Sequence, residues 1–192
     1  MYRMSIITLL APPSLASRLD LGRCTLMALV HDMAESLVGD ITPVDGVLKA
    51  EKSRREAATM EFLCTGLLGR VGGGAAGEEM RKVWQEYEDG VTLEAMFVHD
   101  VDKVELLLQM VEYEREKGGK LNLGEFAWVA KRIVLPEVRQ WCEEILGERE
   151  SFWSRLGTSA DGEPLSEERR LQQEEYYVGS NGGGDGDVHG SN

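Results

Sequence analysis

Four ionisable side chains lie within ten residues of one apolar segment: His31, Asp32, Glu35 and Asp40. The segment has the composition of a buried helix, and a buried charge is costly unless it is paired or ligates a metal. Neutral imidazole together with carboxylate oxygens suits Mn²⁺, Co²⁺, Zn²⁺ or Fe²⁺. The pattern therefore indicates a divalent-cation site, with a lysine elsewhere in the fold as the alternative partner of Asp32.

A second apolar segment contributes a further candidate ligand. Asp102 lies within a run of apolar residues at helical spacing, so its carboxylate is expected to face the core side of a helix. His99 and Asp100 form a second His-Asp pair in the same run. From residue types and spacing alone, either His-Asp pair can be the ligand pair.

The elements that must position these residues are predicted to be helices. Residues 21–38 carry apolar side chains three or four apart, so they predict one mostly buried helix that places Glu35 on the face of His31 and ends at Gly39. Gly, Pro and Asp make 39–46 a loop, and five glycines make 69–77 a flexible connection. Further helices are predicted at 49–68, 78–88, 92–113 with Thr92 as cap, 120–135, and 136–153 with Pro136 in the first turn. No segment alternates like a strand, so the fold class is all-α.

Length and charge limit the organisation and the partners. The 192 residues suffice for one domain, 1–157, followed by an acidic, Gly-rich tail, 158–192, predicted to be disordered. No apolar run reaches the ~20 residues of a membrane span, and a net charge of −13 argues against nucleic-acid binding. Three widely spaced cysteines fit a reducing compartment, so we expect the cytoplasm, with the nucleus as the alternative.

The first residues allow two interpretations. Arg3 followed by the apolar run 6–11 has the outline of a short signal peptide. The preferred interpretation is the end of a helix that begins upstream of Met1 and is stopped by Pro12 and Pro13.

Several motifs occur together in one order: HDMAE at 31–35, GDITP at 39–43, EKSRRE at 51–56, WQEYE at 84–88 and FVHDVDK at 97–103. In this combination the chain resembles the HD-domain phosphohydrolase superfamily, and within it the HD domain-containing protein 2 group and the YfbR-type 5′-deoxynucleotidases. The resemblance implies an all-α HD-domain bundle of roughly six or seven helices and a homodimer. It also implies hydrolysis of deoxyribonucleoside 5′-monophosphates to deoxyribonucleoside and phosphate with a divalent metal cation such as Mn²⁺ or Co²⁺.

The resemblance also assigns roles to individual residues. His31, Asp32 and Asp102 match metal ligands; Glu35 matches the acid beside the metal and Asp40 the acid near the substrate. In the eukaryotic group Glu35, Asp40 and the backbone carbonyl of Ile41 hold a second cation. His99 is then incidental, and Asp100 is its solvated neighbour or an outer support of the site. Apart from the resemblance, the charge run 49–56 is expected to be a solvated helix face, with a phosphate contact from Lys52, Arg54 or Arg55 near the Asp40 loop as the alternative.

One departure from the family pattern keeps a second function open. The family's first metal-ligating histidine would fall immediately before Met1, so the chain resembles an N-terminally truncated member. One hypothesis is a metal-dependent 5′-deoxynucleotidase whose translation starts upstream or whose site tolerates the gap. The alternative is a catalytically impaired, truncated HD domain that binds a nucleotide or a protein partner.

Overall fold

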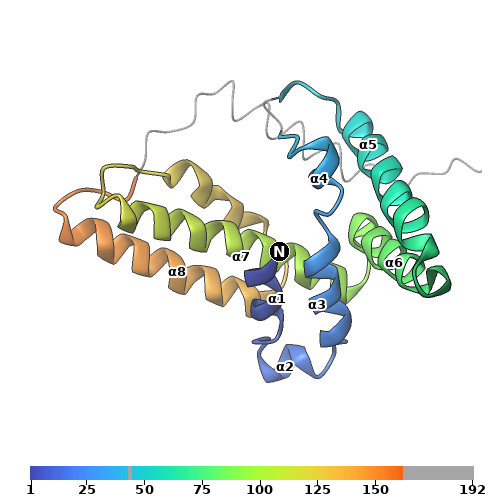
Figure 1. Cartoon of the computed structure of the whole chain (residues 1–192). Helices are drawn as coiled ribbons and strands as arrows, with labels where there is room; N and C mark the ends of the chain where they lie inside the picture. The colour runs from blue at the N-terminus through green and yellow to red at the C-terminus, as the bar shows by residue number, and fades with distance from the viewer. Residues whose placement is uncertain (43–44, 162–192) are drawn as a thin grey trace, which may run out of the picture.

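A computed structural model describes residues 1–42 and 45–161 of the chain (Figure 1). Within these residues the protein has eight α-helices and no strand, which confirms the all-α fold class. The α-helices are α1 (Tyr2–Thr8), α2 (Pro13–Ala16), α3 (Leu21–Val30), α4 (Glu35–Val38), α5 (Lys49–Glu61), α6 (Ala75–Asp89), α7 (Leu93–Glu116) and α8 (Pro136–Arg155). Residues 162–192, which make up most of the predicted tail, lie outside the described residues.

Helix α7 is the centre of the architecture. It packs against α1, α3, α6 and α8, and α8 runs alongside it in Figure 1. The buried side chains of α7 include Phe97, Val101, Val104 and Leu107, which recur three or four residues apart as a helix surrounded by neighbours requires. Thr92 caps the helix as predicted, because its hydroxyl accepts a hydrogen bond from the Ala95 amide. No helix in the described part of the chain is long and apolar enough to cross a membrane.

The segment that carries the first His-Asp pair is not the continuous helix predicted for 21–38. Helix α3 ends at Val30, residues 31–34 form tight turns, and α4 begins at Glu35. Hydrogen bonds in this stretch join residues three apart, for example from the Met33 amide to the Val30 carbonyl at 3.1 Å. The helix is therefore locally tightened at the polar residues, and the predicted sharing of one helical face by His31 and Glu35 does not hold.

The connection between α5 and α6 is more ordered than a flexible glycine linker. Helix α5 continues as a π-helical turn, η2 (Phe62–Leu67), followed by the 3₁₀ turns η3 (Leu68–Arg70) and η4 (Gly72–Gly74). Gly77, in the first turns of α6, lies so close to η2 that a Cβ there would sit 2.1 Å from the Cys64 carbonyl oxygen. The glycine is thus required by a close backbone approach. The helix predicted for 120–135 is instead the 3₁₀ segment η5 (Gly124–Arg132).

Two buried carboxylates hold α7 to its neighbours. Glu114 accepts hydrogen bonds from Arg149 on α8, at 2.9 Å, and from the indole of Trp153, at 2.8 Å. Asp100 accepts the backbone amides of Val134 and Leu135, at 3.0 and 2.8 Å, just before α8 begins. The interpretation of Asp100 as a solvated residue is therefore wrong. Its side chain is fully buried and binds the backbone at the start of α8.

Candidate functional site

His31 stands at the end of α3 with its ring buried. Its Nδ1 lies 3.1 Å from the carbonyl oxygen of Ala28, and since a carbonyl can only accept, Nδ1 carries the proton of this hydrogen bond. The lone pair is then on Nε2, the nitrogen that points away from the helix. A ring fixed in this way through one nitrogen is the usual arrangement of a metal-ligating histidine.

Two carboxylates from different helical segments face that nitrogen. Asp32 Oδ2 lies 2.8 Å and Asp102 Oδ1 3.9 Å from His31 Nε2. Despite these distances, the buried Nε2 makes no hydrogen bond of acceptable geometry with any residue that the structure describes. Burial by itself would lower the pKa of His31, but Asp32 and then Asp102 raise it overall. The site thus attracts positive charge to the imidazole nitrogen, whether as a proton or as a cation.

This donor set fits a divalent cation. It consists of one imidazole nitrogen without a hydrogen bond of acceptable geometry and two carboxylates whose side chains are each almost half exposed. Within 1–42 and 45–161, however, no three His, Cys, Asp or Glu side chains lie close enough together to hold a metal ion by themselves. The structure brings His31 and Asp102 together as the sequence suggested, while the identity of the ligands stays a prediction.

The second His-Asp pair does not join this group. His99 Nε2 lies 2.9 Å from the Tyr87 carbonyl oxygen and donates to it, while Asp100 binds backbone amides at the start of α8. The ring of Tyr87 stacks on His99, with 3.9 Å between ring centroids, and its other neighbour is His31, at 5.0 Å. His99 thus lies outside the group around His31, as predicted, and its ring packs on Tyr87, which also contacts His31.

Glu35 and Asp40 enlarge the acidic cluster around Asp32. Burial, followed by the negative charges of Asp32 and Asp40, raises the pKa of Glu35 to about 7, and Lys52 opposes the shift. Gly39, with φ of 78°, ends α4 and turns the chain so that Asp40 emerges exposed. The neighbouring Ile41 is buried. Glu35 thus interacts electrostatically with both Asp32 and Asp40, while the roles predicted for Glu35, Asp40 and Ile41 stay predictions.

Helix α5 supplies charged residues that the sequence interpretation missed. Glu56 is only 8% exposed and its pKa is raised by burial, so it does not belong to a solvated face. Its position four residues before the buried Met60 was the available signal. Lys52 lies 3.6 Å from Glu56, whereas Arg54 and Arg55 both bind Glu51 at 2.7 Å on the exposed side. Of the three candidate phosphate contacts, Lys52 is thus the one held toward the acidic cluster.

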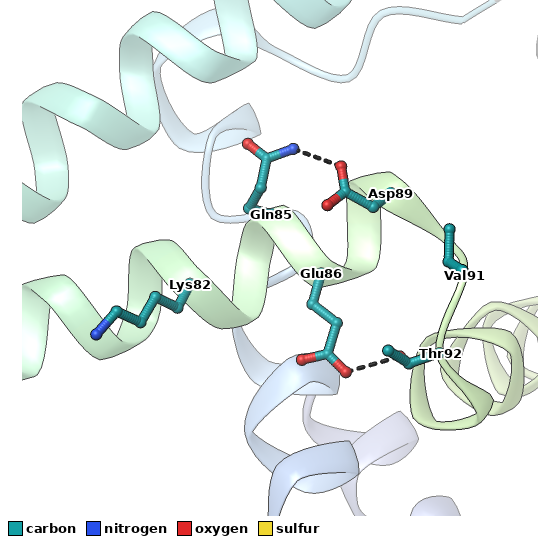
Figure 2. Close-up of a pocket in the computed structure, with 6 residues that line it drawn as sticks. All are labelled: Lys82, Gln85, Glu86, Asp89, Val91 and Thr92. Atoms are coloured by element: carbon teal, nitrogen blue, oxygen red, sulfur yellow. Dashed lines mark hydrogen bonds between the residues drawn. The ribbon is translucent and has the colours of Figure 1, made fainter. Parts of the chain in front are cut away.

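A separate hollow lies at the far end of α6. Figure 2 shows its lining, in which Gln85 donates to Asp89, and the Thr92 hydroxyl to Glu86 at 2.7 Å. None of its lining residues belongs to the group around His31. Because its described acids are already engaged with neighbours, this hollow is not favoured as the active site.

Comparisons with known proteins identify the family of the chain. Residues 1–141 match the HD domain family. The chain is 44% identical over 157 residues to 5′-deoxynucleotidase hdd1 of Schizosaccharomyces pombe, covering 81% of this chain and 77% of that protein. It is 38% identical over 151 residues to the human 5′-deoxynucleotidase HDDC2, covering 78% and 70%.

A solved structure shows the same likeness in three dimensions. The HD domain-containing protein YGK1 superposes with a TM-score of 0.65 at 35% identity, covering 80% of this chain and 76% of that chain. Family match, sequence identity and fold point to the same group. The chain therefore belongs to the HD-domain family and, within it, to the group whose curated members are named 5′-deoxynucleotidases.

Proposed function

We propose that this phosphohydrolase cleaves deoxyribonucleoside 5′-monophosphates to deoxyribonucleoside and phosphate, using a divalent cation held by His31, Asp32 and Asp102. The observation that carries the proposal is the buried Nε2 of His31, which faces two carboxylates of different helical segments without a hydrogen bond among the described residues. The substrate class is supported by the names of relatives that are 38–44% identical.

The residues of this chain then have distinct tasks. A bound Mn²⁺ or Co²⁺ would acidify water and polarise the phosphoryl oxygens. Glu35 is placed beside Asp32 to take a proton from the attacking water at a carboxylate oxygen. Asp40, exposed at the loop after α4, positions the substrate or protonates the departing O5′ of deoxyribose. Lys52 is the basic residue that we assign to the phosphate, and its support is its electrostatic interaction with Glu35.

Glu35 and Asp40 also define a second cation position, together with the backbone carbonyl of Ile41. The support is the mutual electrostatic interaction of the two carboxylates, which a cation between them would relieve. Counting the Mn²⁺ ions bound per chain by calorimetric titration tests this position. If the wild-type chain binds one Mn²⁺, the second position does not exist and Glu35 acts in proton transfer only. If the wild type binds two and Asp40→Asn binds one, Asp40 is a ligand of the second cation.

The decisive test is phosphate release from dAMP, dCMP, dGMP and dTMP, with the ribonucleotides alongside, in the presence of Mn²⁺ or Co²⁺. We expect turnover by the wild-type chain and a loss of at least about 10–100-fold in Asp102→Asn, because even outer supports of metal sites contribute that much. Asp89→Asn, an exposed acid on α6, is the matched control and should retain activity. Mn²⁺ binding without any phosphate release would favour the impaired nucleotide- or partner-binding domain.

We also infer a homodimer located in the cytoplasm or nucleus, without a nucleic-acid partner. The resemblance to the HD-domain group supports the dimer, and the net charge of −13 supports the absence of nucleic acid. Sedimentation at several protein concentrations tests the dimer.

A further inference from the structure

The aromatic ring of Tyr87 contacts two imidazoles that come from different parts of the chain. It stacks on His99 of α7, with 30° between the ring planes, and it contacts His31, just after α3, with 57° between the planes. Tyr87 itself is on α6 and is 8% exposed. The three rings therefore join α3, α6 and α7 at the level of the candidate metal site.

His99 is itself held in place from two directions. Its Nε2 donates to the Tyr87 carbonyl oxygen at 2.9 Å, and its own backbone carbonyl accepts the ammonium of Lys103 at 2.7 Å. The adjoining Gly90 ends α6 in a left-handed conformation, φ 63°, next to the His99 ring. His99 thus binds the last turn of α6 in two ways: it donates a hydrogen bond to the backbone of Tyr87 and stacks on the Tyr87 ring.

The buried ring of His31 is held by one hydrogen bond to the backbone and by the side chains packed around it. The residue stands where α3 gives way to tight turns. The ring of Tyr87 contacts the imidazole at a tilt, with 5.0 Å between the ring centroids and 57° between the planes. A change in the position of Tyr87 would therefore rotate the imidazole and redirect the lone pair of Nε2.

Asp102 is affected by the same contact. It lies three residues after His99 on α7, so the two side chains share one helical face. Through its hydrogen bond and its ring contact with Tyr87, His99 joins the helix that carries Asp102 to the helix that carries Tyr87. The contacts of His99 therefore affect the positions of two candidate ligands, His31 and Asp102.

We propose that His99 is a positioning residue for the metal site: it holds Tyr87 against the imidazole of His31 and so aims Nε2 at the cation. The proposal deepens the proposed function and rests on it. A histidine suits the task because it combines a flat ring face with an N–H donor. Phenylalanine would keep the face alone and glutamine the donor alone.

The test is calorimetric titration of the metal-free full-length chain with Mn²⁺. We expect His99→Ala to raise the Kd of Mn²⁺ about tenfold, the lower end of the effect of outer supports of metal sites. His99→Gln and His99→Phe should each recover part of that affinity, which also provides folded variants if His99→Ala is unstable. Val138→Ala, a buried change on α8 away from the three rings, controls for a general loss of stability and should leave the Kd unchanged.

A second measurement needs no metal. The chain has three histidines, so the ring proton signals of His31 can be assigned by NMR. In His99→Ala the His31 ring signals should shift as Tyr87 moves, and in Val138→Ala they should stay in place. Unchanged His31 signals, or a wild-type Kd in His99→Ala, would overturn the positioning role while leaving the proposed function intact. A wild-type chain that binds no Mn²⁺ but shows the predicted His31 shift would contradict the metal site and still support the positioning contact.

Discussion

At the scale of single residues, His99 has a second consequence, for the pH dependence of folding. Burial, and then the charge of Lys103, lowers the pKa of His99 to about 4, against 6.5 for an unperturbed histidine. The folded chain therefore binds fewer protons at this residue than the unfolded chain between these two values. The associated stability is fully present above about pH 6.5 and is lost as the pH falls toward 4, by about 2 kcal/mol near pH 5.

The prediction is tested by urea unfolding of the wild-type chain and His99→Gln near pH 7 and near pH 5. Glutamine does not titrate, so the variant should lose about 2 kcal/mol less stability than the wild type over this interval. Comparing the two proteins cancels the contributions of carboxyl groups such as Glu56, whose raised pKa acts in the opposite direction. Equal losses in the two proteins would show that His99 is protonated as easily in the folded chain as in the unfolded one.

The individual residues also show how far the sequence could locate the site. The pairing of His31 with Asp102 was predictable, because ionisable residues within an apolar periodicity need partners and two such segments were visible. Asp100 was misjudged, because its partners are backbone amides 34 and 35 residues further along the chain, which leave no trace in residue types. The brace formed by His99 was missed for the same reason, since it grips the Tyr87 carbonyl.

At the scale of elements, two ion pairs between α7 and α8 offer a matched comparison. Glu114 and Arg149 form a buried pair, whereas Arg115 and Glu148 form an exposed pair between the same two helices at 2.8 Å. Glu114→Gln should destabilise the fold by about 3–5 kcal/mol, because the buried guanidinium of Arg149 loses its counter-charge. Glu148→Gln should cost less than about 1 kcal/mol. Chemical unfolding of both variants measures the difference, and similar losses would contradict the importance assigned to burial.

Two glycines in helices should respond to alanine in opposite directions. Gly77→Ala should destabilise the chain by about 1–3 kcal/mol or more, because the new Cβ collides with the Cys64 carbonyl and pushes α6 away from η2. Gly147 is inside α8, and a Cβ added there would meet no described atom within 4 Å, so Gly147→Ala should stabilise the fold by about 0.5–1 kcal/mol. Thermal unfolding of the two variants measures both effects. A Gly77→Ala chain as stable as the wild type would show that η2 shifts to accommodate the added Cβ.

The elements that were predicted well are those whose pattern is local. Helices α7 and α8 have a capping threonine and an N-terminal proline, respectively, and begin at the residues these imply. The break after Val30 and the π-helical turn at Phe62 had no such signal. The apolar spacing continues through both places, so it predicts an uninterrupted helix across each of them.

At the scale of the whole molecule, the candidate site joins parts of the chain that are far apart in sequence. In Figure 1, α3 lies between α7 and α8 on one side and α5 and α6 on the other. His31 directly follows α3, Glu35 begins α4, and Lys52 and Asp102 are on α5 and α7. A ligand shared by these residues therefore binds only the assembled fold, and its binding energy adds to the stability of the whole domain.

This linkage gives a prediction that does not depend on turnover. Mn²⁺ at a hundred times its Kd should stabilise the chain by about 2.7 kcal/mol, which corresponds to a rise in Tm of roughly 5–10 °C for a protein of this size. Asp102→Asn should lose most of that rise, because Asp102 contributes the ligand that connects α7 to His31. Asp89→Asn should keep the full rise, and excess chelator should abolish it in every variant. If Asp102→Asn were stabilised by Mn²⁺ as strongly as the wild type, the cation would bind elsewhere on the chain. The contacts of His31 with Asp32 and Asp102 would then be structural ion pairs that hold the end of α3 to α7.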